Sequence, residues 1–141
     1  MTSTGIDGLE NTIHKTNEWL NDIMEEEGWT DKNKAYLALR STLHALRDRL
    51  VVEEAIDLGA QLPLLIRGLY YEGYTVSGKP DRSHTKDEFF SLIRKELERT
   101  PDIDAEEAAR GVFSVLRKKV SKGEINDIQS MLPKEVQELW H

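Results

Sequence analysis

The sequence contains no cysteine, and this absence excludes several kinds of site. A chain without thiols forms no disulfide bond, no thiolate metal site and no cysteine nucleophile, so its stability must come from packing alone. Chains of this kind are usual in the cytosol, where thiols stay reduced. We therefore expect a cytoplasmic protein.

Long hydrophobic runs are also missing. No apolar stretch reaches the roughly 20 residues that a membrane-spanning helix needs. The segment from Met1 to Gly5 shows no basic start followed by an apolar run, as a secretory signal would. We expect neither a membrane span nor export by such a signal.

Positive charge is outnumbered, with 19 Lys and Arg against 26 Asp and Glu and a formal net charge of −7. Such a surface repels phosphate backbones at long range, so a nucleic acid would need a local basic patch. The candidate is the segment that carries Lys79, Arg82, His84 and Lys86. The overall charge argues against this reading, and we expect no nucleic-acid partner.

Catalytic motifs are absent as well. The sequence has no phosphate-cradling glycine loop, no Ser-His-acid signature and no HExxH. Among the scattered histidines only His44 has a close partner, Asp48 four residues later, and two ligands do not make a metal site. We expect a protein that is not an enzyme, with no catalytic residues, metal or cofactor.

What the sequence does contain is a repeat at one gapless offset. Pro63 corresponds to Pro133 (133 − 63 = 70), and a leucine precedes each. The further identical pairs at this offset include Glu18 and Glu88, Ile23 and Ile93, Ala38 and Ala108, Arg40 and Arg110, Arg47 and Arg117, Glu54 and Glu124, and Asp57 and Asp127. We predict a first helical repeat with an N-terminal extension in residues 1–71, a linker in 72–86 and a second repeat in 87–141.

Helical periodicity fills both copies. A capping pattern at Asp7 opens a first helix that runs to Gly28, and Thr30-Asp31 opens a second with an apolar stripe at spacings of three and four. A short third helix ends before each Leu-Pro. Because proline suits the first turn of a helix, Pro63 and Pro133 mark corners where fourth helices begin. No segment alternates as a strand does.

The predicted fold is therefore all-α, a tandem duplication of a four-helix unit packed as one compact helical domain. A chain of 141 residues is ordinarily one domain and is long enough to bury roughly two thirds of its unfolded surface.

Several runs carry a resemblance to a known family. They are Leu43-His44-Ala45-Leu46-Arg47-Asp48-Arg49-Leu50, Glu53-Glu54-Ala55, Gln61-Leu62-Pro63, Tyr70-Tyr71-Glu72-Gly73-Tyr74 and Gly78-Lys79-Pro80. Over residues 17–140 the chain resembles the bacterial family catalogued as domain of unknown function 2267. The resemblance implies an all-helical cytoplasmic fold of two repeats, with no established activity, cofactor or catalytic residue. The second copy has Met131 where the first has Gln61, so a role for that glutamine need not apply to both halves.

Paired charges recur in both copies. The arginines are Arg40, Arg47, Arg110 and Arg117, and the acids one helical turn apart are Glu54 with Asp57 and Glu124 with Asp127. They are consistent with two symmetric anion or cation sites. They are also consistent with structural ion pairs, in which each arginine bridges the second helix to the third. We expect the structural role, because matched opposite charges satisfy each other.

The fourth helices differ between the copies. Leu64, Leu65 and Gly68 occupy the positions of a lysine and two glutamates in the second copy. This apolar face must be covered by the other repeat or the linker, or by a partner protein or second subunit. The candidate interaction residues are Leu64, Leu65, Tyr70, Tyr71 and Tyr74. We expect a non-catalytic protein-interaction module; the alternative is a small-ligand or metal-binding protein that uses a groove between the repeats.

Overall fold

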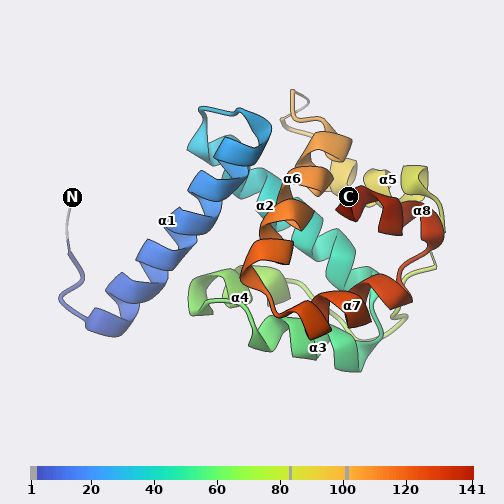
Figure 1. Ribbon diagram of the computed structural model, residues 1–141, viewed down its shortest axis with the longest axis horizontal. Coiled ribbons are helices and arrows are strands. Elements are labelled where there is room, and N and C mark those ends of the chain that lie inside the picture. The colour runs from blue at the N-terminus through green and yellow to red at the C-terminus, as the bar shows by residue number, and fades with distance from the viewer. Residues whose placement is uncertain (1–2, 83, 101) are drawn as a thin grey trace.

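The regular secondary structure is helical throughout the part of the chain that the computed structural model describes, residues 3–82, 84–100 and 102–141. In chain order the elements are α1 (Asp7–Glu27), α2 (Lys32–Arg49), α3 (Val52–Ala60), α4 (Leu64–Tyr71), α5 (Lys86–Glu96), α6 (Ala105–Lys119), α7 (Lys122–Met131), α8 (Lys134–Gln137) and the 3-10 helix η1 (Glu138–Trp140). The predicted all-α class is confirmed for these ranges (Figure 1).

Polar side chains cap α2, α5, α6 and α7. The Asp31 side chain accepts a hydrogen bond from the Asn33 N–H at α2, and Asp104 accepts one from the Glu107 N–H at α6. Each fourth helix begins directly after its proline, at Leu64 and Lys134. The corners predicted from proline are therefore confirmed.

The start of α1 differs from the expected capping box. Its N-cap is Ile6, which has no capping side chain. The Glu10 carboxylate instead accepts hydrogen bonds from the Ser3 hydroxyl at 2.7 Å and the Thr4 N–H at 2.5 Å. The chain before α1 thus folds back onto the first turn of the helix. Its other end closes as expected, since Gly28 adopts a left-handed φ of 70° and donates its N–H to the Met24 carbonyl.

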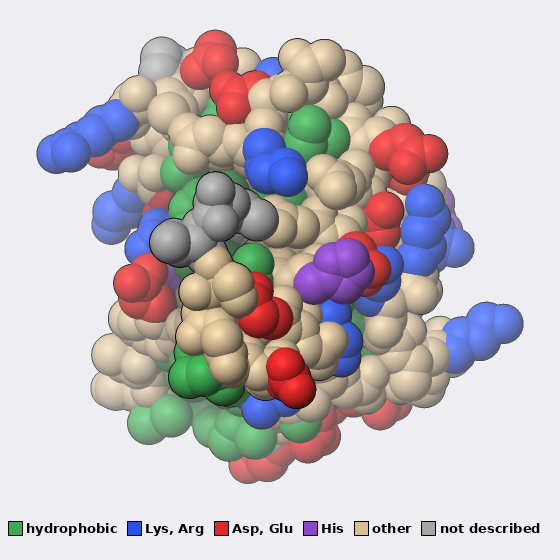
Figure 2. Space-filling view, turned by 90° about the vertical axis from the view of Figure 1, so that its left-hand side faces the viewer, with side chains coloured by type: hydrophobic (Ala, Val, Ile, Leu, Met, Phe, Trp, Pro, Cys, Tyr) green, Lys and Arg blue, Asp and Glu red, His purple; other side chains and the backbone are tan. Residues whose placement is uncertain are grey.

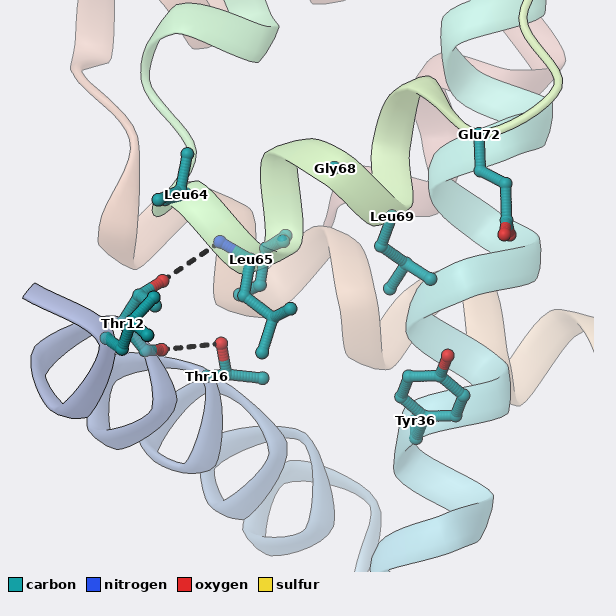
Figure 3. A pocket seen from close by; sticks show the side chains of 10 residues that line it. Thr12, Thr16, Tyr36, Leu64, Leu65, Gly68, Leu69 and Glu72 are labelled. Atoms are coloured by element: carbon teal, nitrogen blue, oxygen red, sulfur yellow. Dashed lines mark hydrogen bonds between the residues drawn. The ribbon is translucent and has the colours of Figure 1, made fainter. Parts of the chain in front are cut away.

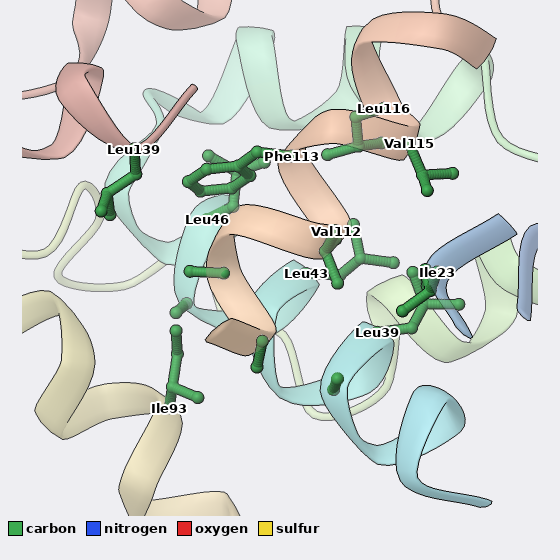
Figure 4. Packing of buried hydrophobic residues seen from close by; sticks show 14 of the residues in the cluster. Ile23, Leu39, Leu43, Leu46, Ile93, Val112, Phe113, Val115, Leu116 and Leu139 are labelled. Carbon is green, nitrogen blue, oxygen red and sulfur yellow. The ribbon is translucent and has the colours of Figure 1, made fainter. Parts of the chain in front are cut away.

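The core forms where α2 and α6 pack against each other (Figure 4). Fully buried side chains from α2, α6, α1 and α5 meet there, and they include Leu39, Leu43, Leu46, Val112, Leu116, Ile23 and Ile93. Phe113 of α6 stacks on Trp140 of η1, with ring centroids 4.1 Å apart and planes at 4°. The η1 helix therefore packs directly against the central helix α6.

The other helices pack around this centre in a crossed arrangement. α1 contacts α6 as well as α2, and α5 contacts α2 as well as α6, so each of these helices packs on both halves of the chain. α4 lies against α1 and α2, α8 lies against α5, and α3 contacts α7 along the lower edge in Figure 1. None of the helices in the described ranges combines the length and apolar character needed to cross a membrane.

The starts of several helices are separated by the repeat offset. α3 begins at Val52 and α7 at Lys122 (122 − 52 = 70), and α4 and α8 begin at Leu64 and Lys134 (134 − 64 = 70). The first helices break this match. α5 begins at Lys86, which corresponds to position 16 (86 − 70 = 16), whereas α1 begins at residue 7. The α1 helix has 21 residues and α5 has 11, so α1 carries additional turns at its start.

Candidate functional site

An apolar groove of about 410 Å³ lies between α1, α2 and α4. Its lining consists of Leu9, Thr12, Thr16, Tyr36, Leu64, Leu65, Ile66, Gly68, Leu69 and Glu72. Figure 3 shows Leu65 and Leu69 pointing from α4 into the space between α1 and α2. Most of its wall is hydrocarbon, so the groove suits an apolar occupant and offers few groups for chemistry.

A hydrogen bond holds the two sides of the groove together. The Leu65 N–H, in the first turn of α4, donates to the Thr12 hydroxyl oxygen of α1 at 2.9 Å (Figure 3). The first N–H groups of a helix have no partner within it, so this side chain of α1 serves as a cap for α4. One wall of the groove therefore comes partly from the added turns of α1.

Large apolar side chains remain exposed around this groove. Leu64 is 60% exposed and Leu65 is 49% exposed on α4. Ile6, Leu9 and Ile13, at the start of α1, are 57%, 41% and 39% exposed. Figure 2 looks onto the α1 side of the molecule and shows hydrophobic side chains gathered along its lower edge. Among the described residues, Leu64 and Leu65 therefore remain about half exposed or more.

The predicted tyrosines lie elsewhere. Tyr70 is fully buried and its hydroxyl donates to the Ala55 carbonyl at 2.7 Å, so it belongs to the core and not to a surface. Tyr71 and Tyr74 are partly buried and pack against the core. The spacing could have indicated this, because Tyr70 follows Ile66 by four residues and so lies on the same face of the helix. Ile66 is also fully buried.

Two of the predicted arginines bind carbonyls at the ends of α4 and η1. Arg47 donates through Nη1 to the carbonyls of Tyr70 at 2.5 Å and Glu72 at 2.7 Å. Arg117, its counterpart at the repeat offset, donates to the Trp140 carbonyl at 2.7 Å. The last carbonyls of a helix lack intrahelical partners and form its negative pole, so a guanidinium is a favourable cap. Among the described residues, the hydrogen-bond partners of these two side chains are these carbonyls and Asp48, in place of the expected third-helix carboxylates.

The other two arginines also pair with acids outside the third helices. Arg40 binds Glu72 and Glu96, each at 2.7 Å. Arg110 binds Glu106 on its own helix at 2.9 Å. In the described ranges no ion pair joins any of the four arginines to the predicted third-helix carboxylates. The expected bridges are thus replaced by contacts to the linker, to α5 and within α6.

The histidine singled out in the sequence is part of a buried polar network. His44 Nδ1 lies 2.8 Å from a Glu96 oxygen and its Nε2 lies 2.8 Å from the Leu69 carbonyl. Asp48, the expected neighbour, instead accepts from Arg47 Nε at 3.0 Å. Both ring nitrogens of His44 are therefore engaged by protein oxygens, and the His44–Asp48 pair is not a half-site for a metal.

The third-helix acids meet one another where α3 contacts α7. Glu54, Asp57 and Glu124 each offer an oxygen, and these oxygens lie within 4.8 Å of one another. Glu54 is 7% exposed and Glu124 is 8% exposed. The Oε1 atom of each has no hydrogen-bond partner in the described part of the chain. Burial raises the pKa of Glu124 to about 8, assisted by a hydrogen bond with Glu54 and by the negative charges of Glu54, Asp57 and Asp127.

A glutamine explains why Glu124 points toward Glu54. Ser121 caps α7 by accepting from the Glu124 N–H at 3.3 Å, which is half of a capping box. The other half would be a bond from the Ser121 N–H to the Glu124 carboxylate, but Gln61 Oε1 accepts that N–H at 2.9 Å. Gln61 therefore frees the Glu124 carboxylate. Met131, its counterpart, can offer no such bond.

The comparison with protein families places this chain. The family described as "Uncharacterized conserved protein (DUF2267)" matches residues 16–139. The chain belongs to this family. The predicted resemblance is thus confirmed, and no curated protein matches the sequence.

The matched range includes one candidate site of this DUF2267 chain completely and the other only in part. The acidic cluster and the α4 wall of the groove lie within residues 16–139. Leu9 and Thr12, which line the opposite wall, lie before residue 16. The groove is thus built partly from turns of α1 that the family match does not include.

Proposed function

We propose that this protein is a non-catalytic protein-interaction module whose groove receives the start of α1 from a second copy of the chain. One observation carries the proposal: an exposed apolar ridge and an apolar groove lie side by side on one face. The ridge is formed by Ile6, Leu9 and Ile13, and Leu64 and Leu65 border the groove.

The ridge is the exposed part of a longer apolar stripe. Ile6, Leu9 and Ile13 continue at helical spacing into Leu20 and Ile23, which are 6% and 0% exposed. The second part of the stripe is buried in the protein's own core. The first part extends beyond that core, so a stripe built for burial is left in contact with water.

A second copy fits this face because of its symmetry. In a two-fold interface the same patch meets itself, so it must present both a protruding and a hollow part. Here the two parts adjoin, and an apolar helix lying in a groove is a common binding mode. Both copies carry a formal charge of −7, so the attraction comes from apolar contact and works against charge repulsion.

The proposal includes the tandem duplication, with four-helix repeats in residues 1–71 and 87–141 and a linker in 72–86. The matched starts of α3 and α7 and of α4 and α8 support it, as do the equivalent bonds of Arg47 and Arg117. In this view the groove arose where the N-terminal extension lengthened the first helix of one repeat.

The test is the mass of the protein in solution by size-exclusion chromatography with light scattering over a range of concentrations. The wild type should form a dimer. Leu65→Lys should yield a folded monomer, because it places a charge in the apolar interface. Ile56→Lys is the matched control, since Ile56 is a helical apolar residue of similar exposure, 52%, outside the groove. It should remain dimeric.

Salt provides a second readout. Screening weakens repulsion between like charges and leaves apolar contact intact, so added salt should strengthen the dimer. A wild type that is monomeric at every concentration overturns the proposed occupant and leaves the groove to a different protein. A Leu65→Lys variant that is dimeric and folded shows that the interface lies elsewhere.

The alternative function is a small ligand or metal held between the repeats by Arg47 and the paired acids. The arginine and the acids have different surroundings. Arg47 is engaged by the end of α4, on carbonyls of Tyr70 and Glu72. The observation that favours a cation is the meeting of Glu54 with Glu124 between α3 and α7.

A further inference from the structure

We propose that Glu54, Asp57 and Glu124 form a binding site for a hard divalent cation, with Ca²⁺ the best fit, at the contact between α3 and α7. The site is separate from the groove between α1 and α4 and does not depend on dimer formation. Each of the three residues offers a carboxylate oxygen, and the oxygens lie within 4.8 Å of one another.

The two glutamates show that this cluster is more than a group of surface acids. Solvated acids would satisfy their oxygens with water, but Glu54 and Glu124 are 7% and 8% exposed. The Oε1 atom of each is buried without a hydrogen-bond partner in the described residues. A buried carboxylate oxygen without a donor is costly, and a cation is the ligand that would satisfy two of them together.

The surrounding charges point the same way. The charged groups that act most strongly on Glu124 are Glu54, Asp57 and Asp127, all acidic. The nearby Tyr70 hydroxyl of α4 donates to the Ala55 carbonyl and so offers the carboxylates no proton. The arginines of α2 and α6 are bound to other groups. A positive ion therefore supplies the charge that this part of the fold lacks.

Geometry and donor type select the class of ion. Two oxygens that bind one Ca²⁺ at about 2.3–2.6 Å can be at most about 5 Å apart, so the three carboxylates need little movement. An all-oxygen set favours Ca²⁺, Mg²⁺ or Mn²⁺ over zinc and copper, which prefer nitrogen and sulfur ligands. Asp57 is exposed, which leaves one side open for the waters that complete the coordination.

The repeat provides a matched control. Asp57 corresponds to Asp127 (127 − 57 = 70), and both are exposed on their helices. Only Asp57 belongs to the set of converging oxygens in the described residues. Asp57→Asn should therefore weaken cation binding much more than Asp127→Asn, although both changes remove the same charge from equivalent positions.

The experiment is a calorimetric titration of untagged, chelator-treated protein with CaCl₂, MgCl₂ and MnCl₂ in turn, with the melting temperature measured in parallel. Ca²⁺ should bind the wild type saturably near one ion per chain and raise its melting temperature, because the ion binds the folded state. Glu54→Gln and Asp57→Asn should lose this response, and Asp127→Asn should keep it.

Three outcomes would overturn the site. One is a wild type that none of the three ions binds saturably at millimolar concentration, which would leave the glutamates as a hydrogen-bonded pair only. Another is binding that persists unchanged in Glu54→Gln. The third is equal loss in the two aspartate variants, which would indicate a diffuse charge effect. If Glu54→Gln fails to fold, the exposed Asp57 and Asp127 pair still decides the question.

Discussion

The helices α4 and α8 lie at corresponding positions of the sequence, separated by the repeat offset, but their surfaces differ in chemical character. Along α8, Lys86 of α5 binds Glu138 at 3.2 Å and donates its backbone N–H to Glu135 at 3.3 Å. Along α4 the same positions are apolar or small, and α1 reaches α4 through Thr12 and leaves a groove. The comparison shows how a longer neighbouring helix with an apolar partner face produces an apolar groove where the counterpart face is charged.

The largest expected effect is at the end of the second half. Trp140 is 2% exposed and stacks on Phe113, whereas its counterpart Tyr70 closes the first half by a hydrogen bond. Trp140→Ala should lower the free energy of unfolding by about 3–5 kcal/mol, because it removes a large buried ring. Tyr70→Phe should lower it by only about 1 kcal/mol. Urea denaturation measures both, and equal effects would show that the two ends are held alike.

A smaller effect, on the pH dependence of stability, separates Glu124 from ordinary surface acids. The pKa of Glu124 is raised from 4.5 to about 8, so between these values the folded protein binds more protons than the unfolded chain. Its contribution to stability is complete below pH 4.5 and is lost as the pH rises toward 8. In chelator, unfolding free energy should fall across this window by a few kcal/mol at most.

The control for this pH dependence is Glu124→Gln, which cannot ionise. Its stability should change little between pH 5 and pH 8, the range over which that of the wild type is expected to fall. Thermal melts of both proteins at several pH values measure the difference. Parallel curves for wild type and variant would contradict the assignment of the slope to this residue.

The smallest effects concern the contact of Thr12 with α4 and the contact of Lys86 with Glu138. Thr12→Val removes the cap of the Leu65 N–H and should destabilise the protein by about 1–2 kcal/mol, since a partly buried donor loses its partner. Lys86→Ala removes a partly exposed ion pair and should matter by less than about 1 kcal/mol. Chemical denaturation orders the two, with Thr12→Ser, which keeps the hydroxyl, as the control. A larger loss for Lys86→Ala would reverse the comparison.

Local signals account for what could be predicted from the sequence. The cap at Asp31 and the corners at Pro63 and Pro133 depend on residues next to each other in the chain, and all three are confirmed. The family was also recognisable from short runs, and the match to residues 16–139 confirms it.

The partners of charged residues were not predictable in the same way. Arg47 binds carbonyl groups of the main chain 23 and 25 residues later, which every residue possesses and no pattern of side chains can mark. The meeting of Glu54 with Glu124 depends on how α3 packs against α7. The identities of the acids were visible in the repeat, but their convergence required the fold.

The crossed packing of the first helices has a consequence for how the chain can be divided. Because α1 packs on α6 and α5 packs on α2, each half completes the interior of the other. A polypeptide interrupted between Gly73 and Gly78 would yield two fragments that are each poorly folded alone. Mixed together, they should reassemble without a covalent link, which makes this architecture a natural starting point for a split reporter.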